Sequence, residues 1–443
     1  MRRLTPFLPA LLLALGLVLA IGGGRSPSRA DEPPDGKGPV VIDVRGAQRD
    51  LYKIAVPRLV GDSPTGNLAA EVISYDLGIS GWFKVLDPRS FLAHLETEGT
   101  GIVVGDWRNV GAEGVSKGRA TVEGDALALE MKLYEIGRGD KPVLEKNYKG
   151  TKAQLRSFAH QWSSEVVKYF TNEDSFFNSK ITFQASTKGG GKDIFVMDYD
   201  GANVYQVTSN HSQNILPAWS PSGGQIAYTS FLRGNPDLYL IPSGGGRGKR
   251  ISDRPGVNMG AAFSPDGSRI ALTLSQDSNP EIYLIGTDGS ILKRLTNNPF
   301  IDSSPAWSPD GSQIAFVSNR HGSPQIWTMS SSGGEPTRLT HKGNYNQEPS
   351  WCPKCAQPTI AFTARDEKGN FDCFTINVAT GEVVRLTEGQ GSNQHPTWAP
   401  NGKVLAMASS RGGIWLTTAD GKIQKQAYKG NAEVPVWGPA LQR

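Results

Sequence analysis

The chain has 443 residues, which is enough for two domains and a substantial hydrophobic core. Its formal charge is +4, but residues 1–30 hold four arginines and no acidic residue, so the rest of the chain is close to neutral. The composition therefore offers no basic excess for binding phosphates, and we expect no nucleic-acid partner.

The first thirty residues have the pattern of a secretory signal peptide. Arg2 and Arg3 precede an apolar run over residues 7–21, and residues 28–30, Ser-Arg-Ala, form a small-x-small cleavage site. The apolar run is shorter than the roughly 20 residues that a spanning helix needs, which argues against a membrane anchor. We predict cleavage after Ala30 and a flexible leader over residues 31–39, which are rich in Pro, Gly and charge.

Residues 40–172 mix helical and strand patterns and predict an α+β N-terminal domain. Strands are expected at 52–56, 83–86, 126–136 and 143–148. Apolar residues at 68, 72, 75 and 79 fall on one face of a helix. Thr151 and Gln154 form a capping box ahead of a second amphipathic helix, whose apolar stripe is expected to pack on the sheet.

From residue 177 to 443 the chain repeats nearly the same pattern. An innermost strand ending in an aromatic residue is followed by a turn and further short apolar strands. The aromatics are spaced 44, 44, 44, 47 and 39 residues apart, and they are Trp219, Phe263, Trp307, Trp351, Trp398 and Trp437. A period in the forties with four strands in each copy predicts a β-propeller with one sheet per blade.

The two ends of the repeat region predict how the propeller closes. The copy around Ile181 has no innermost strand before it, and Trp437 has no second strand after it. We therefore expect the C-terminal strand to complete the first blade, which removes exposed sheet edges and gives an all-β, six-bladed propeller.

Three cysteines are too few for a disulfide scaffold. Cys352 and Cys355 take the place of the Ser-Pro-Asp-Gly turn of other blades, and Cys373 lies on a later strand. The pattern favours a local disulfide in an oxidising compartment, with free thiols and a metal site as the alternatives. Histidines at ligand spacing are absent from the sequence, so we expect no metal and no cofactor.

Residues 114–118, Gly-Val-Ser-Lys-Gly, match the G-x-S-x-G signature of serine hydrolases. That signature needs a strand, a sharp turn at the serine and a helix, whereas the residues after Ser116 have a strand pattern. We interpret the match as chance and expect no catalytic residue. A secreted propeller enzyme of hydrolase or lactonase type, with carboxylates or histidines at the channel mouth, is the alternative hypothesis.

The loops leading into the innermost strands are rich in amides and hydroxyls. Such groups exchange hydrogen bonds without the desolvation cost of full charges, which suits a protein-docking face, although Asn and Gly also simply form turns. The candidate residues on this face are His211, Asn214, Val257, Asn258, Gly260, Asp302, Ser303, Asn346, Gln347, Asn393 and His395.

From about Val40 to its C-terminus the chain resembles the TolB family, the periplasmic propeller proteins of the Tol–Pal system. The resemblance rests on the Ser-Pro-Asp-Gly repeats and on four segments, residues 76–86, 106–112, 155–160 and 435–439. It implies a monomeric, non-enzymatic hub in the periplasm, peripheral to the envelope membranes, that supports outer-membrane integrity and constriction during cell division.

The resemblance also implies two partners. The peptidoglycan-associated lipoprotein Pal would bind the propeller face opposite the N-terminal domain, at positions that include Val257, Asn258, Gly260 and Ser303. At the position of Val257 the resemblance implies a histidine, so this residue departs from the family pattern. TolA would bind the mature N-terminal segment, which here is Val40, Val41, Ile42, Asp43 and Val44.

Overall fold

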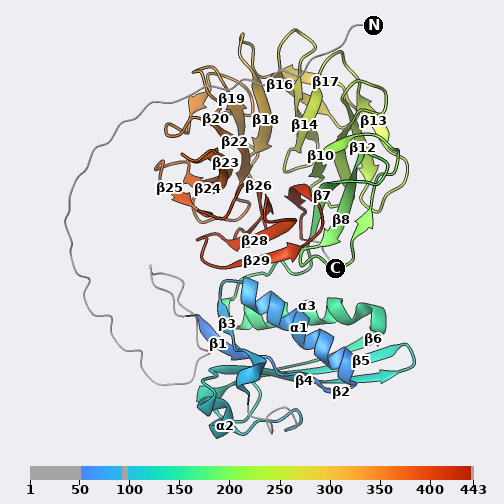
Figure 1. Ribbon diagram of the computed structural model, residues 1–443, viewed down its shortest axis with the longest axis vertical. Helices are drawn as coiled ribbons and strands as arrows, with labels where there is room; N and C mark the ends of the chain where they lie inside the picture. The colour runs from blue at the N-terminus through green and yellow to red at the C-terminus, as the bar shows by residue number, and fades with distance from the viewer. Residues whose placement is uncertain (1–50, 92–97, 441–443) are drawn as a thin grey trace, which may run out of the picture. The chain divides into compact units, whose positions relative to one another are not determined.

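The structure is a computed structural model that describes residues 51–91 and 98–440 (Figure 1). The predicted signal peptide, the leader and the segment 40–44 lie outside the described residues. Among those that are described, no helix is both long enough and apolar enough to cross a membrane.

The N-terminal region is a mixed sheet covered on one face by two long helices (Figure 1). Its sheet has the order β3-β1-β4-β5-β6, with β1 parallel to β3 and β4 and with β2 beside β4. The elements are β1 (Tyr52–Ala55), β2 (Val60–Gly61), α1 (Ser63–Ile79), β3 (Phe83–Val85), α2 (Val104–Asn109), β4 (Gly114–Glu123), β5 (Ala126–Glu135), β6 (Leu144–Thr151) and α3 (Leu155–Thr171), with short 3-10 turns at Pro88–Ser90, Ile136–Arg138 and Lys152–Gln154.

Local capping explains where the two long helices begin. The Asp62 carboxylate accepts a 3.1 Å hydrogen bond from the Thr65 amide at the start of α1. The predicted capping box before α3 is confirmed, since the Thr151 amide donates to Gln154 Oε1 at 2.9 Å. Both helices bury an apolar face, with Ile73 and Trp162 fully buried. The face predicted for α1 is confirmed only in part, because Val72 and Ile79 are buried whereas Leu68 is 38% exposed.

The propeller consists of six four-stranded antiparallel sheets. In Figure 1 the strands β10, β14, β18, β22 and β26 surround its centre, while β13, β17 and β25 lie at its periphery. The strands are β7 (Lys180–Ser186), β8 (Lys192–Asp198), β9 (Tyr205–Gln206), β10 (Asn214–Trp219), β11 (Gln225–Ser230), β12 (Asp237–Pro242), β13 (Lys249–Ser252), β14 (Asn258–Phe263), β15 (Arg269–Leu274), β16 (Glu281–Gly286), β17 (Ile291–Arg294), β18 (Asp302–Trp307), β19 (Gln313–Ser318), β20 (Gln325–Ser330), β21 (Thr337–Arg338), β22 (Asn346–Trp351), β23 (Thr359–Arg365), β24 (Phe371–Asn377), β25 (Val383–Arg385), β26 (Asn393–Trp398), β27 (Val404–Ser409), β28 (Ile414–Thr418), β29 (Gln424–Tyr428) and β30 (Glu433–Trp437).

The first blade is completed by the C-terminal strand, as predicted. Its sheet has the order β30-β7-β8-β9, and Trp437 pairs with Ile181. The repeated apolar position on the second strand is fully buried in every blade, as Ile181, Ile226, Ile270, Ile314, Ile360 and Leu405. The same holds on the third strand for Ile194, Leu238, Ile282, Ile326, Cys373 and Ile414. These positions form the cores between blades.

The N-terminal region and the propeller share one hydrophobic core. Trp82 follows α1, and it belongs to the same cluster of buried residues as Phe176, Ile414 and Trp437 from the connecting segment and the first and last blades. Lys403 of the last blade lies over the Trp82 ring at 5.7 Å, and its ammonium group contacts Glu173 at 3.1 Å. Apolar packing with a few ion pairs therefore holds these two parts of the chain together.

Cys352 and Cys355 form a disulfide, with their Cα atoms 5.7 Å apart, so the interpretation as a local staple is confirmed. In two other blades the same turn is closed by a hydrogen bond, from Ser264 to Asp266 at 2.5 Å and from Ser308 to Asp310 at 2.6 Å. Cys373 is a buried free thiol. The described part of the chain contains no group of three or more side chains that could hold a metal ion.

Candidate functional site

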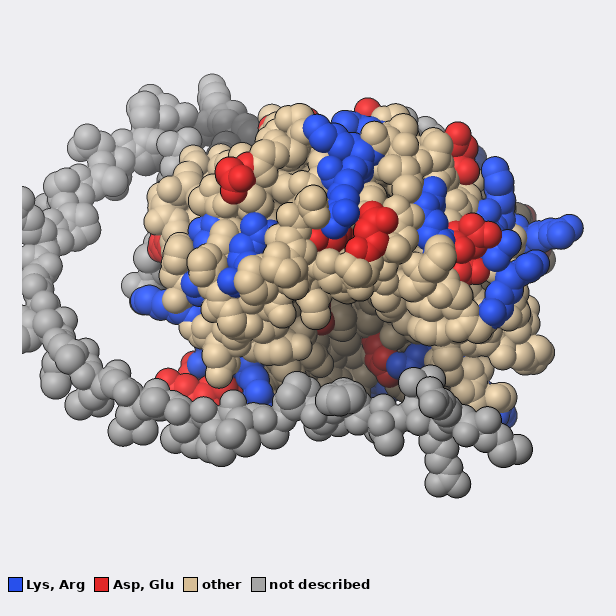
Figure 2. Space-filling model, turned by 90° about the horizontal axis from the view of Figure 1, so that it is seen from above, with Lys and Arg blue, Asp and Glu red and all other residues tan. Residues whose placement is uncertain are grey.

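A cavity of about 750 Å³ opens at the centre of the propeller. Residues from the innermost strands of all six blades line it, so its wall is built from the repeat itself. Figure 2 shows one outer face of the molecule, where Lys and Arg side chains lie beside Asp and Glu. Neither positive nor negative charge dominates that face, which agrees with the nearly neutral composition.

One residue of every innermost strand lines the cavity and has a positive φ. It lies three residues before each aromatic, where the pairing with the second strand shifts register. The six residues adopt φ values of 53, 67, 53, 59, 55 and 50°, and they are Leu216, Gly260, Ser304, Glu348, His395 and Val434. We call them the left-handed ring. Positive φ is costly for residues other than glycine, above all for β-branched Val434, and such strain is concentrated at functional sites.

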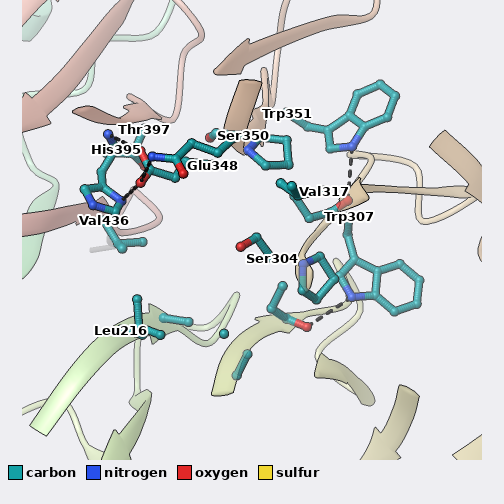
Figure 3. A pocket seen from close by; sticks show the side chains of 18 of the residues that line it. Leu216, Ser304, Trp307, Val317, Glu348, Ser350, Trp351, His395, Thr397 and Val436 are labelled. Carbon is teal, nitrogen blue, oxygen red and sulfur yellow. Dashed lines mark hydrogen bonds and ion pairs between the residues drawn. The ribbon is translucent and has the colours of Figure 1, made fainter. Parts of the chain in front are cut away.

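The left-handed ring is polar on one side only. Glu348 Oε1 lies 3.2 Å from His395 Nδ1, and Glu348 Oε2 accepts hydrogen bonds from the His395 amide and the Thr363 hydroxyl at 2.8 and 2.6 Å. In Figure 3 this pair lies on one wall of the cavity, while Leu216 lies across it. The two ionisable side chains are 18% and 26% exposed, so a bound group could reach them.

Comparison with known proteins identifies the family. The TolB beta propeller domain matches residues 167–441, and the TolB amino-terminal domain matches residues 40–141. The chain belongs to the TolB family. The crystal structure of TolB from Acinetobacter baumannii superposes with a TM-score of 0.76 at 26% identity, covering 88% of this chain and 97% of that one.

The curated TolB relatives match over shorter stretches. The Tol-Pal system protein TolB of Geobacter metallireducens is 40% identical over 188 residues, which is 42% of this chain and 43% of the relative. That of Geobacter sulfurreducens is 38% identical over 193 residues, again 42% and 43%. These matches span less than half of the relatives' length.

Five of the residues predicted for the docking face are buried inside blades. They are 0–2% exposed, and they are Asn214, Asn258, Asp302, Asn346 and Asn393. Asn214 Nδ2 donates to Asp193 Oδ1 at 2.8 Å, and Asn346 Nδ2 donates to Gln325 Oε1 at 2.8 Å on the equivalent strand of another blade. In these two blades the asparagine side chain holds the innermost strand to the third strand of the preceding blade. The side chains of Asn258, Asp302 and Asn393 instead bond to nearby loop residues or to an arginine.

The other predicted residues divide into two groups. Gly260, Ser303, Gln347 and His395 line the cavity. His211 is exposed and Val257 half-buried, both outside the cavity lining. The remaining members of the left-handed ring were not among the predicted residues, and they are Leu216, Ser304, Glu348 and Val434. Their constant distance from the aromatic of each repeat is the signal that would have identified them.

The geometry around Ser116 does not form a nucleophile elbow. Ser116 is fully buried within strand β4, and its Oγ accepts a 2.7 Å hydrogen bond from the Trp162 indole. The nearest downstream histidine, His160, contacts Asp76 rather than Ser116. The G-x-S-x-G match is therefore a structural strand segment, as the strand pattern after Ser116 predicts.

Proposed function

We propose that this TolB-family chain is a periplasmic protein-binding hub of the Tol-Pal system that binds Pal at the mouth of the propeller cavity and TolA through residues 40–44. In this proposal it acts as a monomer, without catalysis, and supports outer-membrane integrity and constriction during division. The observation that carries the proposal is the left-handed ring, because residues with a left-handed backbone, five of them strained since they are not glycine, converge from all six blades on one open cavity in a member of this family.

The chemistry of the cavity suits a protein segment. Ile301 lines the cavity yet is 48% exposed, and the neighbouring Phe300 is 41% exposed. The cavity wall is apolar at Leu216, which lies across the cavity from the Glu348–His395 pair in Figure 3, and at Val434 on the strand beside His395. An apolar centre with a few hydrogen-bonding groups is typical of protein interfaces, where a few anchor residues supply most of the affinity.

Arginine substitutions in the cavity wall test this site. Ser303→Arg and Gly260→Arg each place a long charged side chain where Pal would dock. Gly260 has positive φ, but the other five blades carry side chains at this position, and a Cβ here would meet no atom closer than 3.8 Å. We expect each change to weaken Pal binding by about 2 kcal/mol or more, which is about thirtyfold.

The measurement is calorimetric titration of purified Pal into each variant, with circular dichroism to check the fold. Val384→Arg is the matched control, because Val384 is 41% exposed on the peripheral strand β25. It should bind Pal as the wild type does. Wild-type affinity in both cavity variants would move the interface to another surface.

A further inference from the structure

A buried cluster of charged groups joins the N-terminal region to the propeller. Asp76 lies on α1, His160 lies on α3, and Asp200 lies in the turn between β8 and β9 of the first blade. His160 Nδ1 is 2.9 Å from Asp76 Oδ2, and His160 Nε2 is 3.5 Å from Asp200 Oδ2. The three side chains are 0–7% exposed. One imidazole thus bridges two carboxylates from different parts of the chain.

Aromatic rings separate this cluster from water. The fully buried Tyr199 donates its hydroxyl to Asp76 Oδ1. Phe176 and Trp437 pack on Tyr199, with ring centroids 5.1 and 6.3 Å away. In such surroundings a charge is tolerated only when an opposite charge or hydrogen bonds compensate it.

Each element packed around the imidazole contributes a charged or titratable group. The groups are Tyr75 and Asp76 on α1, Arg156 on α3, Tyr199 and Asp200 at the first blade, and Lys425 on β29. The Arg156 guanidinium pairs with the Asp200 carboxylate. Lys425 lies over the Tyr75 ring at 4.9 Å and donates to the Tyr75 carbonyl at 3.3 Å. Burial lowers the pKa of Lys425, although the Asp76 carboxylate acts against this shift.

The groups in direct contact balance in charge only when the imidazole is protonated. Asp76 and Asp200 supply two negative charges and Arg156 supplies one positive charge, so a neutral His160 leaves one buried carboxylate uncompensated. Burial alone lowers the pKa of His160, but the charge and hydrogen bond of Asp76, together with Asp200, outweigh it and raise the pKa above its ordinary value. Burial raises the pKa of Asp200, although His160 and Arg156 act against it.

We propose that protonated His160 holds α1 and α3 against the first blade, and that loss of its proton loosens the contact between the N-terminal region and the propeller. The stabilisation is fully present below the pKa of an unfolded histidine, about 6.5, and is lost as pH rises through the higher pKa of the folded protein. The contact is therefore a pH-sensitive joint. It does not depend on which partners the protein binds.

Proton NMR of the full chain tests the protonation directly. The His160 ring resonance, assigned by its loss in His160→Gln, should titrate with a pKa clearly above about 6.5. Asp200→Asn removes one of the two facing carboxylates and should lower this pKa by about 1. A His160 pKa at or below the ordinary value would overturn the proposal. If His160→Gln folds poorly, the resonance is assigned by elimination, through glutamine substitution of the other histidines one at a time.

Thermal melting between about pH 6 and pH 9 tests the consequence, since this range spans the ordinary histidine pKa and higher values. His160→Gln keeps a side chain able to hydrogen-bond Asp76 but carries no charge. It should melt below the wild type at the acidic end, and the difference should shrink as pH rises. Exposed His341→Gln is the matched control and should follow the wild type throughout. A difference between the wild type and His160→Gln that is absent or constant over the range would overturn the proposal.

Discussion

The indole nitrogen of Trp219 donates a 3.1 Å hydrogen bond to the carbonyl oxygen of Val436, which lies 217 residues later in the chain. Trp219 ends the innermost strand of the second blade, and Val436 lies on the C-terminal strand that completes the first. The same bond joins other neighbouring blades, from Trp307 to Ala262 at 3.1 Å and from Trp351 to Ala306 at 3.1 Å. The C-terminal strand therefore accepts the indole bond of the next blade as other innermost strands do.

Deleting the chain from Val434 onward should destabilise the propeller strongly. The deletion exposes the edge of β7 and removes Trp437, which is 6% exposed and donates to Ser179 Oγ at 2.7 Å. Loss of a large buried aromatic alone costs about 3–5 kcal/mol. Thermal unfolding should show a melting temperature many degrees lower, or aggregation through the open edge. Unchanged stability would contradict closure by this strand.

Trp307→Phe isolates the hydrogen bond between blades. Phe263 occupies the equivalent position in the preceding blade and is buried without an indole, so a phenylalanine ring fits there. The change leaves the Ala262 carbonyl without its indole partner and should cost about 1 kcal/mol in the free energy of unfolding. Urea denaturation of the two proteins measures it. A cost near that of a core truncation, about 3 kcal/mol or more, would mean that packing rather than the bond is being lost.

The Cys352–Cys355 disulfide should contribute modestly to stability. It closes a loop of only four residues, for which the chain-entropy model gives about 2 kcal/mol. The double variant Cys352→Ser, Cys355→Ser should therefore fold and melt a few degrees lower, since a serine closes this turn in other blades. Cys373→Ala is the control for the free thiol. If reductant lowers the melting temperature of the double variant as much as that of the wild type, the disulfide is not the source of the effect.

The repeat predicted the blades and their closure because each copy carries its own apolar spacing and turn residues. Buried positions such as Ile314 and Ile326 follow from periodicity alone. The candidate site was less predictable. The sequence does not distinguish an asparagine that faces solvent from one, such as Asn214, that bonds to Asp193 of the preceding blade. The Glu348–His395 pair joins residues of two blades, and only the ring geometry brings them together.

The segment 40–44 should carry the TolA site, and its availability should depend on Pal. An alternating β-run can pack on its own protein or add as a strand to the sheet edge of a partner. Deleting residues 31–44 should abolish TolA binding and leave the propeller able to bind Pal, as measured by titration of each purified partner. TolA binding that survives the deletion would place its site elsewhere.

The full chain should then show whether the two partners are coupled. If Pal binding frees the segment, TolA binds more tightly to the Pal complex than to the protein alone, and if Pal binding docks it, TolA binds more weakly. Thermodynamic reciprocity requires TolA to change the affinity for Pal by the same factor, about 5–150-fold for typical coupled sites. Titrating each partner in the presence and absence of the other measures both factors. Two factors equal to one would show that the propeller cavity and the N-terminal segment act independently.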